Sequence, residues 1–284
     1  MPELPEIEHL KRSLAPILIG ADVRSVRLRR PDVLRPAPAG RGPRRTSGRA
    51  LLAGGRIDRL DRRGKQLALI ADDGRLVCIH LGMSGELRFL EPRERLSDAR
   101  HVHCTWTIDS PRGPGRLVFR DPRRFGGLWT FPSADELDRQ RWSGLGPDAL
   151  TIRAPVLAAR TAGTRRAIKS ALLDQRLIAG VGNIYADEAL FGARIHPLRR
   201  ADKLARTETG RLASALRGVM RCAVAAGGST LRDYVDGRGR RGGFALRHRV
   251  YGRAGEPCVR CRAPLIGIEV GGRTTVYCPS CQEV

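Results

Sequence analysis

Cys258-Val-Arg-Cys261, followed after sixteen residues by Cys278-Pro-Ser-Cys281, is the stretch that determines the fold of the last part of the chain. This spacing is typical of four-thiolate zinc sites, in which each pair bends a turn around one ion. Four protein thiolates leave no open coordination position, so we expect one structural Zn²⁺ and no catalytic metal. Two redox-active pairs are the alternative. Between the pairs, residues 266–270 and 274–277, joined by Gly271-Gly272-Arg273, predict a β-hairpin.

The other cysteines, Cys78, Cys104 and Cys222, are scattered, and we expect plain buried thiols. Seven cysteines in a chain with no signal-peptide pattern indicate a reducing compartment. No apolar run approaches the roughly 18 residues of a transmembrane helix. These observations predict a soluble, cytoplasmic protein with no membrane partner.

The chain is strongly basic. Its 284 residues include 52 Lys and Arg against 29 Asp and Glu, which gives a formal net charge of +23. Such an excess favours phosphate-bearing partners, either nucleic acid or a membrane surface. Arginine dominates, and the lysines are only Lys11, Lys65, Lys169 and Lys203, so we regard these four positions as candidates for specific tasks.

Hydrophobic patterning divides the chain into three parts. After a helix with an apolar stripe, short alternating or β-branched segments predict a sandwich or barrel, and the pattern turns helical near Pro132. We expect an α+β fold, with a β-sandwich domain at 1–132, a linker at 133–150, a helical domain at 151–246 and a zinc finger at 247–284. The strands are predicted at 23–28, 67–70, 76–80, 87–90, 102–108, 117–119 and 128–131, and the later helices at 134–141, 154–162, 165–175, 184–191 and 203–225. Two Gly- and Arg-rich segments, 35–48 and 227–243, are predicted to be loops.

A glycine-rich turn, Ile178-Ala-Gly-Val-Gly-Asn-Ile-Tyr185, lies between two of the predicted helices. Bare backbone N–H groups at the start of a helix can cradle a phosphate. Alternatively, Asn183 is an N-cap and nothing more.

Two tight loops of the β domain carry exposed-looking apolar side chains. In residues 120–126, Arg123 and Phe125 are two residues apart, so in extended backbone a cation and a flat ring point the same way. Met83 is the apolar tip of the turn at 80–85. Such side chains suit a wedge that enters a base stack. The alternative is a pair of ordinary hairpin loops with a buried Phe125.

The first eight residues, Met1-Pro-Glu-Leu-Pro-Glu-Ile-Glu8, can make a catalyst of the chain terminus. If Met1 is removed, Pro2 becomes a secondary amine that can attack a sugar C1′ and form an iminium. Glu3 and Glu6 lie beside it, and the positive end of the following helix favours the free amine. The alternative is an ordinary helix start, since Pro and acidic residues are common in a first turn.

Six motifs together resemble the Fpg/Nei family of DNA glycosylases, and the resemblance covers nearly the whole chain. They are residues 2–6, 63–65, 80–85, 121–126, 180–185 and the four-cysteine segment, in the family's order. Leu4 resembles the formamidopyrimidine branch, because the endonuclease VIII branch usually has Gly there. The resemblance implies a β-sandwich with a leading helix, followed by a helix–two-turn–helix domain and a zinc hairpin.

The resemblance also implies catalytic roles. Pro2 would be the nucleophile at C1′, Glu3 the general acid/base, and Glu6 a residue that organises the site. Lys65 would hold a phosphate and assist β-elimination. Arg273 would grip the lesion-flanking phosphates and act in δ-elimination.

DNA contacts are implied at further positions. Met83, Arg123 and Phe125 would fill the gap left by an everted base, with Arg123 facing the orphan cytosine. The remaining contacts would be His101, Arg165, Lys169, Asn183 and Tyr185. The loop at 227–243 matches the flexible lesion-capping loop. The chain departs from the family at His101-Val102-His103, where His-Asp-His is frequent, and in the longer loops 35–48 and 110–115.

The resemblance therefore implies a monomeric base-excision-repair enzyme, a glycosylase and AP lyase for oxidised purines such as 8-oxoguanine in double-stranded DNA. Zinc would be its only metal, and DNA binding would associate it with the nucleoid. Two alternatives remain: an endonuclease VIII-like enzyme for oxidised pyrimidines, and a non-catalytic zinc-containing DNA-binding protein.

Overall fold

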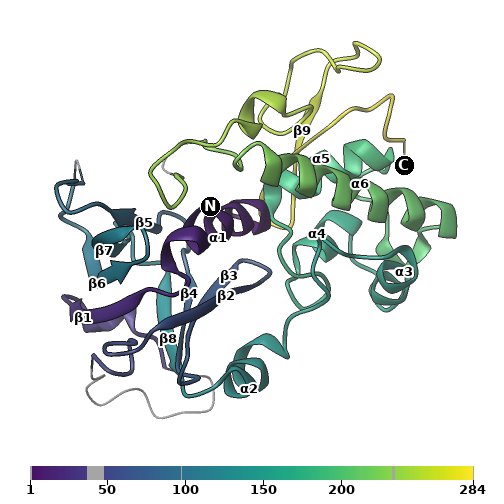
Figure 1. Cartoon of the computed structure of the whole chain (residues 1–284). Helices are drawn as coiled ribbons and strands as arrows, with labels where there is room; N and C mark the ends of the chain where they lie inside the picture. The colour runs from purple at the N-terminus through teal and green to yellow at the C-terminus, as the bar shows by residue number, and fades with distance from the viewer. Residues whose placement is uncertain (1, 37–47, 97, 232–233, 284) are drawn as a thin grey trace. The chain divides into compact units, whose positions relative to one another are not determined.

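The computed structural model describes residues 2–36, 48–96, 98–231 and 234–283 (Figure 1). It forms two units. Unit 1 contains residues 1–144 and 227–242, and unit 2 contains residues 145–226 and 243–284. Most of the predicted loop at 35–48 lies outside the described residues.

Unit 1 contains two four-stranded antiparallel sheets, which confirms the predicted β-sandwich. The strand order is β1-β6-β7-β5 in one sheet and β2-β3-β4-β8 in the other. The bounds are β1 Asp22–Leu28, β2 Ile57–Arg63, β3 Gln66–Ala71, β4 Leu76–His80, β5 Glu86–Leu90, β6 Val102–Ser110, β7 Gly113–Arg120 and β8 Gly127–Phe131.

Helix α1 (Leu4–Leu18) supplies the predicted stripe to the core of unit 1. Ile7, Leu10, Leu14 and Ile17 are at most 5% exposed and join side chains of both sheets in one apolar cluster. Strand β2 escaped the sequence analysis because it is an edge strand with five polar residues in seven, so it lacks a clear alternation.

Residues 227–242 pack with unit 1, not with the helical domain to which the sequence analysis assigned them. Their described backbone is bonded to α1 and to the sheet: Gly237 N donates to Ser13 Oγ at 3.0 Å, and Gly237 O accepts from Phe89 N at 2.9 Å. Chain proximity suggested the helical assignment, whereas these bonds join residues more than 140 positions apart.

Unit 1 also holds α2 (Ala134–Leu137), which continues into a π-helical turn at Asp138–Trp142. Unit 2 contains α3 (Ala154–Ala162), α4 (Ile168–Leu173), α5 (Asn183–Ala193), α6 (Arg206–Ala225) and the antiparallel hairpin β9 (Ile266–Val270) and β10 (Arg273–Tyr277). Helix α4 is shorter than the predicted 165–175, because the backbone before it pairs with another segment, at Ala167 and Arg200.

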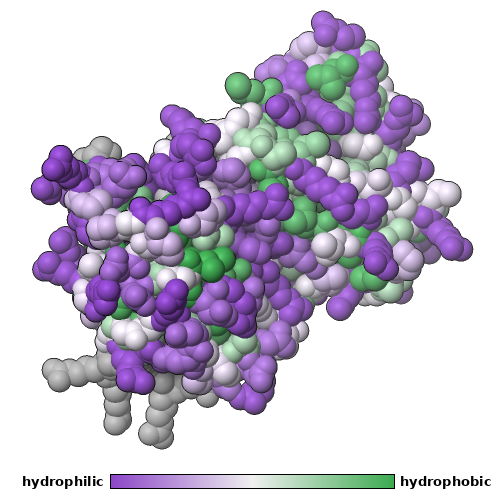
Figure 2. All heavy atoms as spheres, in the orientation of Figure 1, coloured by the Kyte–Doolittle hydropathy of each residue, from purple (hydrophilic) through white to green (hydrophobic). Residues whose placement is uncertain are grey.

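The face in Figure 2 is covered mainly by hydrophilic side chains, with smaller apolar areas between them. None of the helices within the described ranges combines the length and apolar character needed to cross a bilayer. Cys78 and Cys104 are buried as expected, and burial raises the pKa of the Cys78 thiol to about 11. Cys222 is exposed on α6, because it lies on the polar side of that amphipathic helix, so the expectation of a buried thiol is wrong there.

Candidate functional site

The residues at the start of α1 are buried, and two of them are acidic. Pro2 is buried, and Glu3 and Glu6 are 2% and 1% exposed. Glu6 Oε2 accepts a hydrogen bond from Glu3 N at 2.8 Å, which fixes the entry into the helix. The other carboxylate oxygen of Glu6 accepts from Ser229 N at 2.7 Å. Glu6 therefore ties the chain terminus to the segment 227–242.

That segment contacts Glu6 closely at two further points. Tyr234 Oη donates to Glu6 O at 2.9 Å, and a Cβ on Gly228 would lie 2.8 Å from Glu6 Oε1. Burial first, and then the carboxylates of Glu6 and Asp236, raise the pKa of Tyr234 well above its usual value, so its hydroxyl stays a donor. Gly228 also has φ of +82°, a conformation that favours glycine.

Lys65 lies in the two-residue turn between β2 and β3. Arg63 and Gln66 are paired across the hairpin, so Gly64 and Lys65 form its loop, with Gly64 at φ +54°. Lys65 is 8% exposed. The geometry is consistent with a specific task for Lys65, because a tight turn directs its side chain one way.

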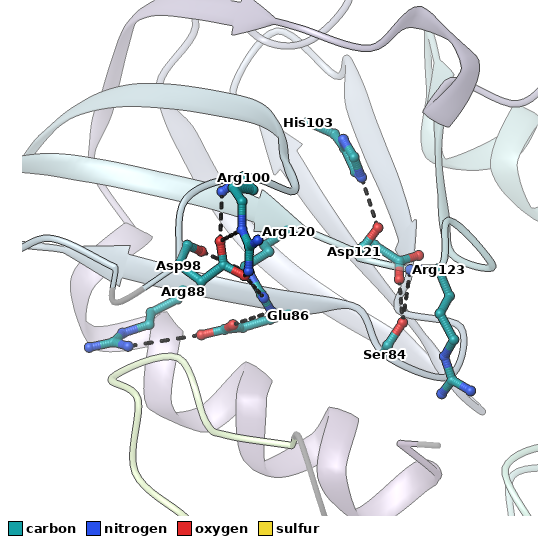
Figure 3. A network of polar contacts seen from close by, with 9 residues as sticks. All are labelled: Ser84, Glu86, Arg88, Asp98, Arg100, His103, Arg120, Asp121 and Arg123. Atoms are coloured by element: carbon teal, nitrogen blue, oxygen red, sulfur yellow. Dashed lines mark hydrogen bonds and ion pairs between the residues drawn. The ribbon is translucent and has the colours of Figure 1, made fainter.

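The two predicted wedge loops are pressed together in unit 1. A Cβ on Gly82 would lie 2.4 Å from Gly126 N, so only glycine permits this approach of the backbones. The buried carboxylate of Asp121 joins the loops, since Oδ1 accepts from Ser84 Oγ at 2.7 Å and Oδ2 from Gly126 N at 2.8 Å. Figure 3 shows the contact between Asp121 and Ser84, with the Arg123 side chain directed away from it.

The side chains at the loop tips are exposed. Phe125 is 61% and Met83 41% exposed, and the Arg123 guanidinium lies 5.7 Å from the centre of the Phe125 ring. The alternative of a buried Phe125 is therefore wrong. Large exposed apolar groups on a rigid turn are typical of a binding surface.

The histidines near these loops differ in their surroundings. His101 is partly buried, and its carbonyl accepts from Asp121 N at 3.0 Å. The His103 ring is 4% exposed, and its Nε2 lies 2.8 Å from Asp121 O. His103 therefore supports the Asp121 backbone, whereas His101 is the one of the two with an accessible side chain.

In unit 2, the glycine-rich turn leads into α5 as predicted. Gln175 holds it from inside: Oε1 accepts from Gly180 N at 2.8 Å, and Nε2 donates to Val181 O at 2.8 Å. Asn183 is the first residue of α5, not its N-cap, and its Nδ2 donates to Thr274 O at 2.9 Å. Arg165 is exposed just before α4.

Two of the predicted DNA contacts are interior residues. Lys169 is 0% exposed, and its Nζ lies 2.6 Å from Asp187 Oδ1 and 2.6 Å from Thr275 Oγ1. Tyr185 is also 0% exposed, with its ring 5.8 Å from that of Phe244. Neither side chain has an exposed surface with which to touch a phosphate. The prediction that both contact DNA directly is therefore wrong, and they support unit 2 from its interior.

The four predicted cysteines converge. The Sγ atoms of Cys258, Cys261, Cys278 and Cys281 all lie within 4.8 Å of one another. A tetrahedral Zn²⁺ with Zn–S bonds of 2.3 Å spaces its sulfurs by about 3.8 Å, so the donor set fits one ion. Gln282 braces the cluster, because its Oε1 accepts from Cys278 N and its Nε2 donates to Ile195 O, both at 2.9 Å.

Arg273 is exposed where β10 begins. Gly271 and Gly272 form the turn with φ of +58° and +71°, as a two-residue hairpin requires. The strand beyond it is anchored in the helices: Lys169 Nζ donates to Thr274 O at 3.1 Å, and Asp187 Oδ2 accepts from Val276 N at 3.1 Å. The buried lysine thus positions the arginine.

Family models match nearly the whole chain. The formamidopyrimidine-DNA glycosylase N-terminal domain matches residues 1–128, the H2TH domain of that glycosylase residues 144–235, and a zinc finger found in FPG and IleRS residues 255–284. A formamidopyrimidine-DNA glycosylase of Thermomicrobium roseum is 44% identical, and one of Teredinibacter turnerae 42%, each over 100% of both chains.

The chain belongs to the formamidopyrimidine-DNA glycosylase family. The resemblance seen in the sequence is thereby confirmed. Among solved structures, MutM (FPG) from Thermus thermophilus is 41% identical with a TM-score of 0.84, covering 99% of this chain and 98% of that one. A Lactococcus lactis FPG mutant, bound to Fapy-dG-containing DNA, is 30% identical with a TM-score of 0.87 over 100% of both.

Some residues that shape this glycosylase-family site escaped the sequence analysis. Asp121, Gln175, Asp187 and Gln282 each accept a hydrogen bond from a backbone N–H, namely those of Gly126, Gly180, Val276 and Cys278. Asp121 and Asp187 are charged residues that are almost fully buried, but a single sequence does not reveal burial of an isolated Asp.

Proposed function

We propose that this chain is a bifunctional DNA glycosylase and AP lyase that removes oxidised purines from double-stranded DNA in base excision repair. The observation that carries the proposal is the start of α1, where Pro2 and Glu3 are buried side by side and Glu6 fixes both to the rest of unit 1. Membership of the formamidopyrimidine-DNA glycosylase family supports the choice of substrate.

In the proposed mechanism, removal of Met1 frees the Pro2 nitrogen, which is otherwise a tertiary amide. The neutral nitrogen attacks C1′, its bond to C1′ forms, and the bond from C1′ to the oxidised base breaks. The amine loses its N–H proton in this step, and the base leaves with a proton, so the step is balanced. Glu3 delivers a proton to the sugar ring oxygen, so that the ring opens to an iminium. Loss of a C2′ proton then expels the 3′ phosphate by β-elimination, and a second elimination expels the 5′ phosphate.

Lys65 on its two-residue turn would hold a phosphate near the lesion and assist β-elimination. The exposed Arg273 would act on the flanking phosphates and in δ-elimination. Arg165, Asn183 and His101 are the further phosphate contacts that we propose. Such contacts dominate affinity for DNA and make it salt-dependent.

Base eversion leaves a gap, and the exposed tips Met83, Arg123 and Phe125 would fill it. Flipping costs a few kcal/mol and least for a damaged base, so the rigid loops need only stabilise the gap after it opens. We propose that Lys169 and Tyr185 contribute from inside unit 2, and that the enzyme acts as a monomer on DNA of the nucleoid.

The four-cysteine site would hold one structural Zn²⁺ that fixes the hairpin carrying Arg273. With four thiolates the ion has no open position, so it takes no part in the reaction. Its contribution is the rigidity of the hairpin.

Borohydride trapping tests the proposal. Protein with a verified Pro2 terminus is mixed with duplex containing 8-oxoguanine opposite cytosine, and we expect a covalent complex and β,δ-elimination products. Pro2→Gly and Glu3→Gln should lose base excision. An oxidised-pyrimidine duplex in parallel tests the endonuclease VIII alternative, and tight binding without trapping or cleavage would instead support a non-catalytic DNA-binding protein.

A further inference from the structure

The turn that carries Lys65 is held at both flanks by one short element, the π-helical turn Asp138–Trp142. Arg63 Nη1 donates to Asp138 Oδ1 at 3.0 Å, and Gln66 Oε1 accepts from Arg141 Nε at 2.6 Å. Because Arg63 and Gln66 are directly paired, the two contacts bracket Gly64 and Lys65. π-Helical turns are rare and are frequent at functional sites.

Arg141 is the unusual residue of this turn. It is half-buried, and its guanidinium lies 3.4 Å from the centre of the Trp129 ring. Within the described part of the chain no ion pair of Arg141 is seen, and the nearby carboxylates of Asp138 and Glu136 pair with Arg63 and Arg139 instead. Desolvation of a cation is costly and lowers the pKa of Arg141, so its stacking on Trp129 and its hydrogen bond to Gln66 must offset that cost.

Gln66 receives three donors on one amide oxygen. Besides Arg141 Nε, these are Trp142 Nε1 at 3.2 Å and Cys78 Sγ at 3.3 Å. The bond from Arg141 is the shortest and is charge-assisted, so it contributes most to fixing the side chain. Gln66 directly follows Lys65, and a fixed Gln66 fixes the backbone where the turn ends.

Helix α1 is also bonded to the strand that leads into this turn. Arg62 Nε donates to Glu8 Oε2 at 2.8 Å, and Arg62 Nη1 donates to Gly64 O at 3.0 Å. Burial opposes ionisation of Glu8, but hydrogen bonds from Arg62 and Arg12 outweigh it and lower its pKa. The turn of Lys65 is thus fixed relative to the helix that begins beside Pro2.

His80 lies in the same neighbourhood. It is paired with Gln66 across β3 and β4, and the positive charges of both Arg141 and Lys65 act on its ring. Arg141 bonds Gln66, the residue directly after Lys65, so it lies next to the end of the lysine turn.

We infer that Arg141 is a positioning residue for Lys65: through Gln66 it fixes the direction in which the two-residue turn presents the lysine ammonium. The inference rests on the proposed function for its consequence in catalysis, but not for the effect on Lys65 itself. Nothing in the six sequence motifs includes Arg141, Trp142 or Gln66.

The first test uses the free protein. Because the chain contains only Lys11, Lys65, Lys169 and Lys203, ¹³Cε-lysine labelling gives four resolvable signals, and Lys65→Met identifies one of them. Arg141→Met should shift the Lys65 signal and leave those of Lys169 and Lys203 in place. Arg139→Met is the matched control on the same turn, because its side chain is 73% exposed, and it should shift none. An unmoved Lys65 signal in Arg141→Met overturns the inference.

The second test measures elimination on duplex with a preformed abasic site under single-turnover conditions. A misplaced group costs up to about a hundredfold, so Arg141→Met should slow elimination by about ten- to a hundredfold while the Kd for duplex changes less than about threefold. Arg141→Lys keeps the charge but loses the planar donor, and should stay slow.

The decisive arm adds Arg141→Met to Lys65→Met. If Arg141 acts through Lys65, it causes no further loss in that background. A further loss equal to that in the wild-type background would show a general structural effect and contradict the inference. If wild-type protein with a free Pro2 cleaves nothing, the proposed function fails, and the Lys65 signal alone then decides whether Arg141 positions Lys65.

Discussion

The two units hold their exposed tips by different means. In unit 1, the tip with Met83 and Phe125 stands on a sandwich with a large apolar core, and one buried carboxylate, Asp121, joins its loops. In unit 2, the tip with Arg273 stands on a short hairpin beside four cysteines, and the buried Lys169–Asp187 pair anchors it. The first tip depends on many weak apolar contacts and the second on a few strong polar ones. Loss of one contact should therefore disorder the second tip far more easily than the first.

Metal removal should produce the largest difference in stability between the two tips. Binding of structural zinc is worth about 10–16 kcal/mol in isolated fingers, and much of that is folding free energy. A strong chelator should therefore abolish hydrogen-exchange protection in β9 and β10 while β3 and β4 keep theirs. Protection of β9 and β10 that survives verified metal loss would contradict this division.

Loss of the buried Lys169 ammonium should have the second-largest effect. Lys169→Met leaves Asp187 as a buried charge without its ion-pair partner, which costs about 3–5 kcal/mol. We expect a lower unfolding midpoint for unit 2 in urea and a more mobile hairpin at Arg273. Lys203→Met, at an exposed position of the same unit, is the matched control and should change stability by less than about 0.5 kcal/mol. Equal effects of the two substitutions would refute the anchoring role.

Acid should weaken the support of the unit 1 tip. His80 Nδ1 accepts from Gly82 N at 3.1 Å, and burial first, then the charges of Arg141 and Lys65, lower the pKa of His80 to about 4. Between pH 6.5 and about 4 the unfolded chain binds a proton at this position and the folded chain does not, so stability falls as the pH falls.

At pH 5 this histidine should account for a loss of about 2 kcal/mol relative to pH 7. The measurement compares urea unfolding of unit 1 at both pH values for wild type and for His80→Gln, which cannot titrate. The variant should lose less stability on acidification. The same loss of stability in both proteins would show that His80 does not cause it.

An effect of similar size is expected at Asp121. Asp121→Asn keeps the shape but gives up hydrogen bonds to a charged acceptor, each worth about 1.5–3 kcal/mol, and the amide oxygen retains one of them. We expect a loss of about 2 kcal/mol in unit 1 and greater mobility of Phe125, read from side-chain NMR relaxation. A loss as large as that of Lys169→Met would mean that the two tips are held alike.

Local features of the site were predictable from the sequence. The hairpin turn before Arg273, the helix start after Pro2 and the cysteine cluster follow from short-range chemistry, because glycine, proline and cysteine spacing constrain backbone directly. The hairpin turn of Lys65 was not predicted, because β2 lacks a clear alternation of apolar and polar residues. The wedge loops were predicted as loops, but only the structure shows that Phe125 is exposed.

Features that depend on distant partners were not predictable. The resemblance implied that Lys169 contacts DNA, but its side chain is buried. A buried lysine needs partners, and these are Asp187 and Thr275, the latter 106 positions away. Likewise, nothing local to residues 227–242 indicated that Glu6 binds their backbone. Partners so far apart in the sequence become visible only in the folded structure.

The position of the covalent bond shows whether Pro2 is the nucleophile. After borohydride trapping on 8-oxoguanine duplex and digestion of protein and DNA, mass spectrometry locates the remaining sugar adduct. We expect the adduct on the nitrogen of Pro2, in the peptide that contains Glu3 and Glu6. An adduct on Lys65, or on any other lysine, would show that Pro2 is not the nucleophile.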